Sequence, residues 1–404
     1  MTEDITPVDE GSVTTPRGFR AAGVACGIKT GGEKDLALIC SERAGRVVGL
    51  FTENRLPAAP VVLSRGHAAQ GVGRAVVINS GNANACTGPS GMADATEMVQ
   101  RVASGIGCAP EEVFVCSTGR IGIPLPMEKV RRGIDQALER LSPQGGDDAA
   151  VGILTTDTYP KKAGLRVSLG EQELLLGGIA KGAGMIDPHL ATMLCVITTD
   201  GDVSQEALAA AAQRSVADSF NRISIDGDCS TNDTVLVFAN GLARNRPITR
   251  EGGDFRLFQS ALSLLMVRLA RMIVEDGEGV AKVIELLVQG ASDDREAERV
   301  ARAVAHSLLV KCSWHGEDPN WGRILAAIGY SGAAVNGERV DIFYNGVQAV
   351  AGGARRSRSS ARLLREVARL PQFTILIDLG IGSGHFRLLT TDLSERYVRI
   401  NKGE

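Results

Sequence analysis

Short apolar runs rich in valine and isoleucine alternate along the chain with longer segments whose apolar residues recur every three to four positions. The short runs are typical of buried β-strands, and the longer segments are typical of amphipathic helices. The expected strands are Val47–Phe51, Ala75–Ile78, Val113–Cys116, Met193–Ile197, Val235–Phe238, Ile324–Ile328, Val340–Tyr344 and Phe373–Ile377. Because strands and helices interleave, the sequence predicts an α/β or α+β fold.

Three helices stand out from the spacing of their apolar residues. One is expected to follow Asp254 as its N-cap, one to begin near Ser292, and one, rich in alanine, to follow Ser204. The first of them places on one face Phe258, Leu262, Leu265, Leu269 and Met272. With 404 residues, the chain is long enough for two domains or two closely packed halves.

Composition and charge narrow the class of protein. Hydrophobic residues make up 44% of the chain and charged residues 23%, which is the balance of a soluble globular protein. The net charge of −3 favours neither nucleic acid nor an anionic membrane as a partner. Residues 1–15 are acidic, lack the apolar core of a secretory signal, and are expected to be disordered. The sequence has no run of 18 apolar residues, so no membrane span is expected. We expect a cytoplasmic protein.

The cysteines and histidines do not form the pattern of a metal site. The eight cysteines are scattered without a C-x-x-C pair, and the five histidines lack the spacing of metal ligands. The sequence therefore predicts buried free thiols in a reducing compartment and no bound metal.

The segment Gly177–Asp200 combines glycine-rich turns with the pair Ala191-Thr192, which directly precedes an apolar run. A hydroxyl residue at the start of a strand sits on a rigid edge beside backbone that is free to bend. If the Thr192 hydroxyl attacked the Ala191 carbonyl and the bond between them were cut, Thr192 would carry a free α-amine. Such an amine titrates near about 7.7–8.0, so it can serve as the general base for the hydroxyl of its own residue. The plainer interpretation is a β-branched threonine that merely opens a strand.

Seven segments, spread over most of the chain, help to decide between these two interpretations, and one of them contains Ala191-Thr192. They are Asn79–Gly88 (NSGNANACTG), Cys116–Gly122 (CSTGRIG), Thr155–Asp157 (TTD), Lys181–Leu194 (KGAGMIDPHLATML), Asp226–Thr234 (DGDCSTNDT), Glu278-Gly279 and Asp318–Arg323 (DPNWGR). In this order they resemble the ornithine acetyltransferase family, the bifunctional glutamate N-acetyltransferases of arginine biosynthesis. Each segment alone is a weak signal, and the ordered set is a specific one.

The resemblance implies a self-cleaving acyltransferase. The chain would be cut between Ala191 and Thr192 into the pieces 1–191 and 192–404, which would assemble as a heterotetramer of two pieces of each kind. Thr192 would take the acetyl group from N-acetylornithine as an ester and pass it to the amine of glutamate. Acetyl-CoA is a further donor in some members, and no bound cofactor is expected. The implied fold is a layered αββα-type sandwich like that of self-processing N-terminal-nucleophile hydrolases.

The resemblance also implies roles for individual residues. The Thr118 hydroxyl and the Gly119 N–H would form the oxyanion hole. This segment taken alone would be an ordinary turn whose hydroxyls bind local backbone.

The substrate contacts carried over from the family are Thr155, Lys181, Thr192, Glu278 and Asn401. Lys181 suits the α-carboxylate that N-acetylornithine and glutamate share, and Glu278 suits a substrate ammonium. The plainer interpretations are a loop lysine, a solvated turn carboxylate and a strand threonine.

This sequence departs from the family pattern at two places. Asp187 stands where the family commonly has a histidine before the cleavage point, which is expected to alter the rate of self-cleavage. The chain also ends at Glu404, whereas the family usually continues for about five residues beyond the position matched by Asn401, to a terminal Ser or Thr that contacts substrate.

Three hypotheses follow from these patterns. The first is the acetyltransferase, and the second is an N-terminal-nucleophile aminopeptidase or amidohydrolase that would pass the acyl group to water. The third is a catalytically silent paralogue that binds amino acids.

A loop with Arg355, Arg356 and Arg358 is either a solvated turn or a contact for coenzyme A.

Overall fold

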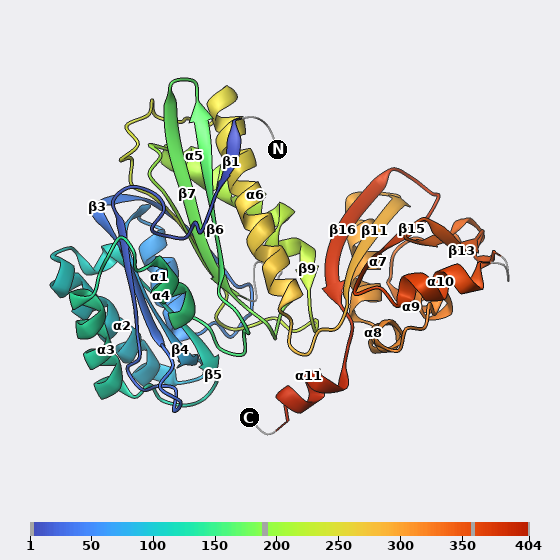
Figure 1. Ribbon diagram of the computed structural model, residues 1–404, viewed down its shortest axis with the longest axis horizontal. Helices are drawn as coiled ribbons and strands as arrows, with labels where there is room; N and C mark the ends of the chain where they lie inside the picture. The colour runs from blue at the N-terminus through green and yellow to red at the C-terminus, as the bar shows by residue number, and fades with distance from the viewer. Residues whose placement is uncertain (1–3, 188–192, 357–359, 403–404) are drawn as a thin grey trace. The chain divides into compact units, whose positions relative to one another are not determined.

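The computed structural model describes residues 4–187, 193–356 and 360–402. It divides into two compact units (Figure 1). The first unit consists of Met1–Asn221 and Asp228–Ile273, and the second of Arg222–Gly227 and Val274–Glu404. Each unit contains one sheet, so the predicted mixed α/β class is confirmed.

The sheet of the first unit has nine strands in the order β1-β6-β7-β8-β10-β3-β4-β5, with β2 paired to β3. Its strands are β1 (Ile5–Val8), β2 (Phe19–Val24), β3 (Leu36–Phe51), β4 (Val72–Asn82), β5 (Val113–Arg120), β6 (Lys161–Leu169), β7 (Gln172–Lys181), β8 (Leu194–Thr199) and β10 (Thr234–Ala239). β8 runs parallel to β10 and antiparallel to β7, so it lies inside the sheet rather than at an edge.

The central strands of this sheet are buried on both faces: successive strand residues point to opposite sides, and both sets belong to core clusters. In β4, Val76 and Ile78 belong to one core cluster, while Ala75 and Val77 belong to another. The second cluster includes the apolar faces of α2 and α3, which lie side by side (Figure 1). The helices that begin in this unit are α1 (Ala59–Ala68), α2 (Gly88–Ile106), α3 (Met127–Glu139), α4 (Gly146–Gly152), α5 (Gln205–Asp218) and α6 (Gly253–Glu275).

α6 is the one helix of the described chain that is long and apolar enough, by length and composition alone, to cross a bilayer. Half of its most apolar stretch is buried within the protein. The hydroxyl of Ser263 lies 2.9 Å from that of Ser215 on α5, and the Leu269 side chain packs on Gly178 of β7. These contacts are those of a core helix.

The second unit is built on a seven-stranded sheet in the order β14-β13-β12-β15-β11-β16-β9. Its strands are β9 (Ile223–Ser224), β11 (Val283–Ala291), β12 (Asp341–Tyr344), β13 (Val347–Ala351), β14 (Ala354–Arg355), β15 (Gln372–Asp378) and β16 (Gly384–Thr391). Its helices are α7 (Asp294–His306), α8 (Leu308–His315), α9 (Trp321–Tyr330), α10 (Ala361–Ala368) and α11 (Glu395–Ile400). Alternate residues of β11, namely Ile284, Leu286 and Val288, form the core with Val300 and Val304 of α7.

Three expectations from the sequence are wrong. Ile324–Ile328 lies in α9, because the Asn320 side chain accepts a hydrogen bond from the Arg323 N–H and caps a helix there. Asp254 lies inside the first turn of α6 rather than before it. Residues 4–15 of the segment expected to be disordered are ordered, since β1 pairs antiparallel with β6 and Val13 is buried.

The thiols only partly match the expectation of buried free cysteines. Cys116 and Cys195 are fully buried, whereas Cys86 and Cys312 are exposed. Burial raises the pKa of the Cys116 thiol to about 12, so it is a poor nucleophile at neutral pH.

Candidate active site

The groups around the start of β8 form the candidate site in the first unit. Ala191 and Thr192, the predicted cleavage site and nucleophile, lie outside the described residues. Leu194, two positions further on, pairs with Lys181 of β7 on one side and with Thr234 of β10 on the other. The Thr234 N–H donates to the Met193 carbonyl at 3.0 Å. The chain that follows the predicted cleavage point is therefore held between these two strands.

The predicted oxyanion hole lies at the end of β5, beside β4. Gly119 has a φ of +130°, and a Cβ atom there would meet the Gly81 carbonyl carbon at 2.3 Å. Only glycine can take this conformation with β4 so close. The hydroxyl of the half-buried Thr118 has no hydrogen-bond partner among the described residues, which leaves it able to donate to a ligand.

Asn232 connects this strand end to the strand that flanks Met193. Its side-chain amide donates to the Ser117 carbonyl at 2.8 Å and to the Ala83 carbonyl at 2.6 Å. Because Asn232 precedes β10 by two positions, one short segment reaches both the predicted oxyanion hole and the start of β8. The sequence motif DGDCSTNDT contains this residue, but its spacing alone did not indicate the role.

Asp233, the next residue, is a second polar group that sequence reasoning missed. It is 2% exposed, and its Oδ2 has no hydrogen-bond partner among the residues that the structure describes. Burial raises the pKa of its carboxyl well above the ordinary value, against hydrogen bonds from Ser230 and the Met193 N–H and the charge of Lys181. A buried carboxyl thus contacts the first residue after the predicted nucleophile.

Asp157 joins two of the predicted substrate contacts. Its carboxylate accepts a hydrogen bond from the Thr155 N–H at 3.0 Å and lies 3.7 Å from the Lys181 ammonium. Its other oxygen accepts from the Lys161 ammonium at 2.5 Å and from the Gly182 N–H at 2.8 Å. Lys181 is therefore a buried ion-pair partner rather than a solvated loop lysine.

A further lysine lies near this cluster. The Lys29 ammonium donates to the Leu154 carbonyl at 2.7 Å, next to Thr155 in the chain. Burial lowers the pKa of Lys29, while the charges of Asp35 and Asp157 oppose that change. The first unit thus gathers cationic side chains around the Thr155–Lys181 side of the site.

The other two predicted substrate contacts meet in the second unit. The Asn401 amide donates to the Glu278 carboxylate at 2.7 Å. Gly279, next to Glu278, has a φ of +67°, and a Cβ there would meet the Tyr397 nitrogen at 2.4 Å. This close approach packs the turn against α11, whose last turn places Asn401 beside Glu278.

Lys311 is a buried cation of the second unit. Its ammonium donates to the Thr391 carbonyl, and burial lowers its pKa to about 8 although Asp226 and Asp392 oppose the shift. Asp392 in turn accepts from the Ala281 and Lys282 N–H groups, both at 3.0 Å. Asp392 thus interacts electrostatically with Lys311 and also binds the backbone just before β11.

This lowered pKa predicts a pH dependence of stability. Between about pH 8 and 10 the unfolded state keeps the Lys311 proton that the folded state has released, so this group makes the free energy of unfolding rise with pH. We expect the difference in unfolding free energy between wild type and Lys311→Met to change by roughly 1 kcal/mol per pH unit in this window. Urea denaturation of both proteins across the window measures it, and a constant difference would contradict the assignment.

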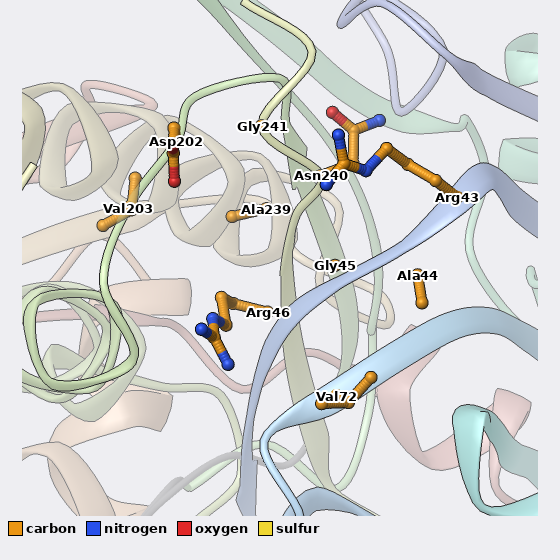
Figure 2. A pocket seen from close by; sticks show the side chains of 10 residues that line it. All are labelled: Arg43, Ala44, Gly45, Arg46, Val72, Asp202, Val203, Ala239, Asn240 and Gly241. Carbon is orange, nitrogen blue, oxygen red and sulfur yellow. The ribbon is translucent and has the colours of Figure 1, made fainter. Parts of the chain in front are cut away.

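A separate pocket of about 270 Å³ lies in the first unit (Figure 2). It is lined by Arg43, Ala44, Gly45, Arg46, Val72, Asp202, Val203, Ala239, Asn240 and Gly241. None of the described residues predicted for the site lines it. Arg43 and Arg46 extend from β3 in Figure 2, but no buried charged group faces them from its lining. Its lining is mostly polar, and it does not extend the candidate site.

A family model and curated relatives both match this chain over most of its length. Residues 20–403 match the family model described as the ArgJ family. The chain is similar to the "Arginine biosynthesis bifunctional protein ArgJ" of Geobacter sulfurreducens, at 46% identity over 95% of this chain and 98% of the relative. It is 47% identical to the protein of the same name from Symbiobacterium thermophilum, over 97% and 98% of the two chains.

A solved structure is also similar. It is the ornithine acetyltransferase of Mycobacterium tuberculosis complexed with ornithine, with 43% identity, a TM-score of 0.44, and coverage of 46% of this chain and all of that chain.

Proposed function

Since the chain belongs to the ArgJ family, it is an arginine-biosynthesis enzyme with glutamate N-acetyltransferase activity, and we propose that it transfers acetyl through an ester on Thr192. The donor is N-acetylornithine and the acceptor is glutamate. The observation that carries the proposal is the Asn232 amide, which ties the end of β5 to the segment leading into β10. Through this hydrogen bond, the strand end that carries Thr118 and Gly119 is connected to the segment that pairs with Met193, the residue after Thr192.

The chemistry has two matching halves. The α-amine of Thr192 takes the hydroxyl proton while the oxygen attacks the acetyl carbonyl of N-acetylornithine, and the Thr118 hydroxyl and Gly119 N–H stabilise the oxyanion. Collapse breaks the amide bond and ornithine leaves with the proton. Glutamate then attacks the ester with its amine, passes through a second oxyanion, and regenerates the Thr192 hydroxyl.

Self-cleavage between Ala191 and Thr192 supplies the amine that this mechanism needs. The resulting pieces, 1–191 and 192–404, would share the nine-stranded sheet, because β8 pairs with β7 and β10 pairs with β3. Burial of these strands from both faces would keep the pieces together after the cut. We propose that two pieces of each kind form the mature heterotetramer.

Substrate recognition divides between two kinds of group. The cationic side, with Lys181 beside Thr155, takes the α-carboxylate that both substrates carry. Glu278, held by Asn401, takes a substrate ammonium. Because both substrates carry an α-carboxylate, Lys181 and Thr155 can bind each of them in turn, as a two-step transfer requires.

The test is an assay of acetyl transfer with each donor and acceptor supplied separately. We expect consumption of N-acetylornithine to require glutamate and to yield one N-acetylglutamate for each ornithine released. Release of acetate without glutamate would instead favour the amidohydrolase, and no turnover with any pair would favour the silent paralogue. A parallel arm with acetyl-CoA and glutamate asks whether the coenzyme is also a donor.

A further inference from the structure

The ammonium groups of Lys161 and Lys181 lie at different distances from the buried carboxylate of Asp157. The side chains of Asp157 and Lys161 are both fully buried, and their charged atoms are 2.5 Å apart. Lys181 lies 3.7 Å from the same carboxylate, beyond hydrogen-bond distance, and its side chain is 9% exposed. The closer ion pair is the one that solvent does not reach.

The surroundings fix Lys161 and leave Lys181 less constrained. The Lys161 ammonium lies over the Tyr159 ring, 5.1 Å from its centroid, and the Tyr159 hydroxyl donates to the Met272 carbonyl at 3.0 Å. Lys181 is the last residue of β7, where the strand gives way to Gly182. The Lys181 side chain is slightly exposed and lies at a strand end, so it can move toward a ligand at a smaller cost than the fully buried Lys161.

Asp157 stays ionised in this arrangement. Burial would raise the pKa of its carboxyl, but the charges of Lys181 and Lys161 hold it well below its usual range. The same carboxylate orients Thr155 through its N–H and Gly182 through its N–H. One charged group therefore fixes the backbone on both sides of the predicted carboxylate-binding region.

We propose that Lys161 is a positioning residue: it neutralises Asp157 from within the core, so that Lys181 remains available to the α-carboxylate of a substrate. This inference rests on the proposed function, because it takes Lys181 as the group that meets that carboxylate. Without Lys161, Asp157 becomes the competitor of the substrate for the Lys181 ammonium. Lys161 thus sets substrate affinity through Asp157 and Lys181 without touching the substrate.

The test is a double-mutant cycle in the full-length enzyme, read as KM and kcat for both substrates. Lys161→Met is expected to raise KM for N-acetylornithine and for glutamate by about 10-fold, equivalent to about 1.4 kcal/mol, with a smaller change in kcat. Adding Asp157→Asn removes the competing charge, and KM is expected to return to within about threefold of wild type. The α-amide of N-acetylornithine, which lacks the carboxylate, should be used equally by wild type and Lys161→Met.

The control is Lys162→Met, the same change on the neighbouring residue. The Lys162 ammonium pairs with Glu10 at 2.6 Å and Asp147 at 2.8 Å, away from Asp157, so KM should not change. Lys161→Gln serves as a second variant, and thermal unfolding of each protein shows whether it is folded.

Two results would overturn the inference in an active enzyme: an unchanged KM in both Lys161 variants, or a double variant no better than Lys161→Met. Failure of the proposed function is recognised separately, because wild type itself would then transfer no acetyl group.

Discussion

Thr192→Ala is expected to yield a single unbroken chain of 404 residues with no acetyl transfer, whereas wild type yields two pieces, the second beginning at residue 192. The substitution removes the hydroxyl that performs the cut and that later carries the acetyl group. Without the cut, no free α-amine exists to act as the base, so we expect activity to fall by roughly 10³-fold or more. Denaturing gels, intact mass and the amino-terminal sequence of the smaller species measure the outcome.

Thr192→Ser is the matched variant, since it keeps a hydroxyl on the same atom position while it removes only the methyl group. It should still be cut and should retain measurable transfer. A wild-type enzyme that is active as one uncut polypeptide would contradict the assigned base, even if Thr192→Ala were inactive. Acetyl exchange in uncut Thr192→Ala would exclude the ester intermediate altogether.

The central strands of the first unit were predictable because they are apolar on both faces. Val113–Cys116 and Ala75–Ile78 are continuous apolar runs, and the structure places them in β5 and β4 between two core clusters. A run buried on both sides needs no alternation of polar residues, so its local composition suffices to indicate a strand.

The errors occur where contacts between distant segments, or a cap, decide the structure. In β1, Ile5 is buried while Thr6 and Pro7 are exposed, a pattern too short to predict a strand. What makes it a strand is its pairing with β6, more than 150 positions further along the chain. The run Ile324–Ile328 has strand-like composition, but the Asn320 cap starts a helix before it. Local propensity cannot outweigh either constraint.

The sequence supplied candidate residues for the site, but not the contacts between them. Resemblance supplied Thr118, Lys181 and Thr155, yet nothing in the spacing indicated that Asp157 joins the last two. Asp157 ends the TTD segment four positions before β6, and a short carboxylate so near the start of a partly buried strand is a signal that could have been used. Such a group must be paired when it is buried, and Lys161 opens the following strand.

Gly119→Ala is expected to lower kcat by roughly 10²-fold or more, because the substitution displaces the N–H assigned to the oxyanion hole. A Cβ at this position would lie 2.3 Å from the Gly81 carbonyl carbon and 2.5 Å from the Asn82 nitrogen, both in the backbone of β4. Backbone cannot yield as a flexible side chain does, so β4 and β5 must separate locally. We expect a loss of roughly 1–3 kcal/mol in stability as well.

Gly122→Ala separates the contribution of the oxyanion hole from the cost of backbone strain. Gly122 also has a left-handed φ, +79°, but a Cβ there would meet nothing within 4 Å. The Gly122→Ala variant should be less stable than wild type by roughly 1 kcal/mol, because alanine disfavours this φ angle, and its kcat should not change. Single-turnover acetylation of Thr192 and thermal unfolding of both variants make the comparison. If Gly119→Ala were folded and acetylated at the wild-type rate, the N–H of residue 119 would not serve the oxyanion, and the donors would have to be sought elsewhere around β8.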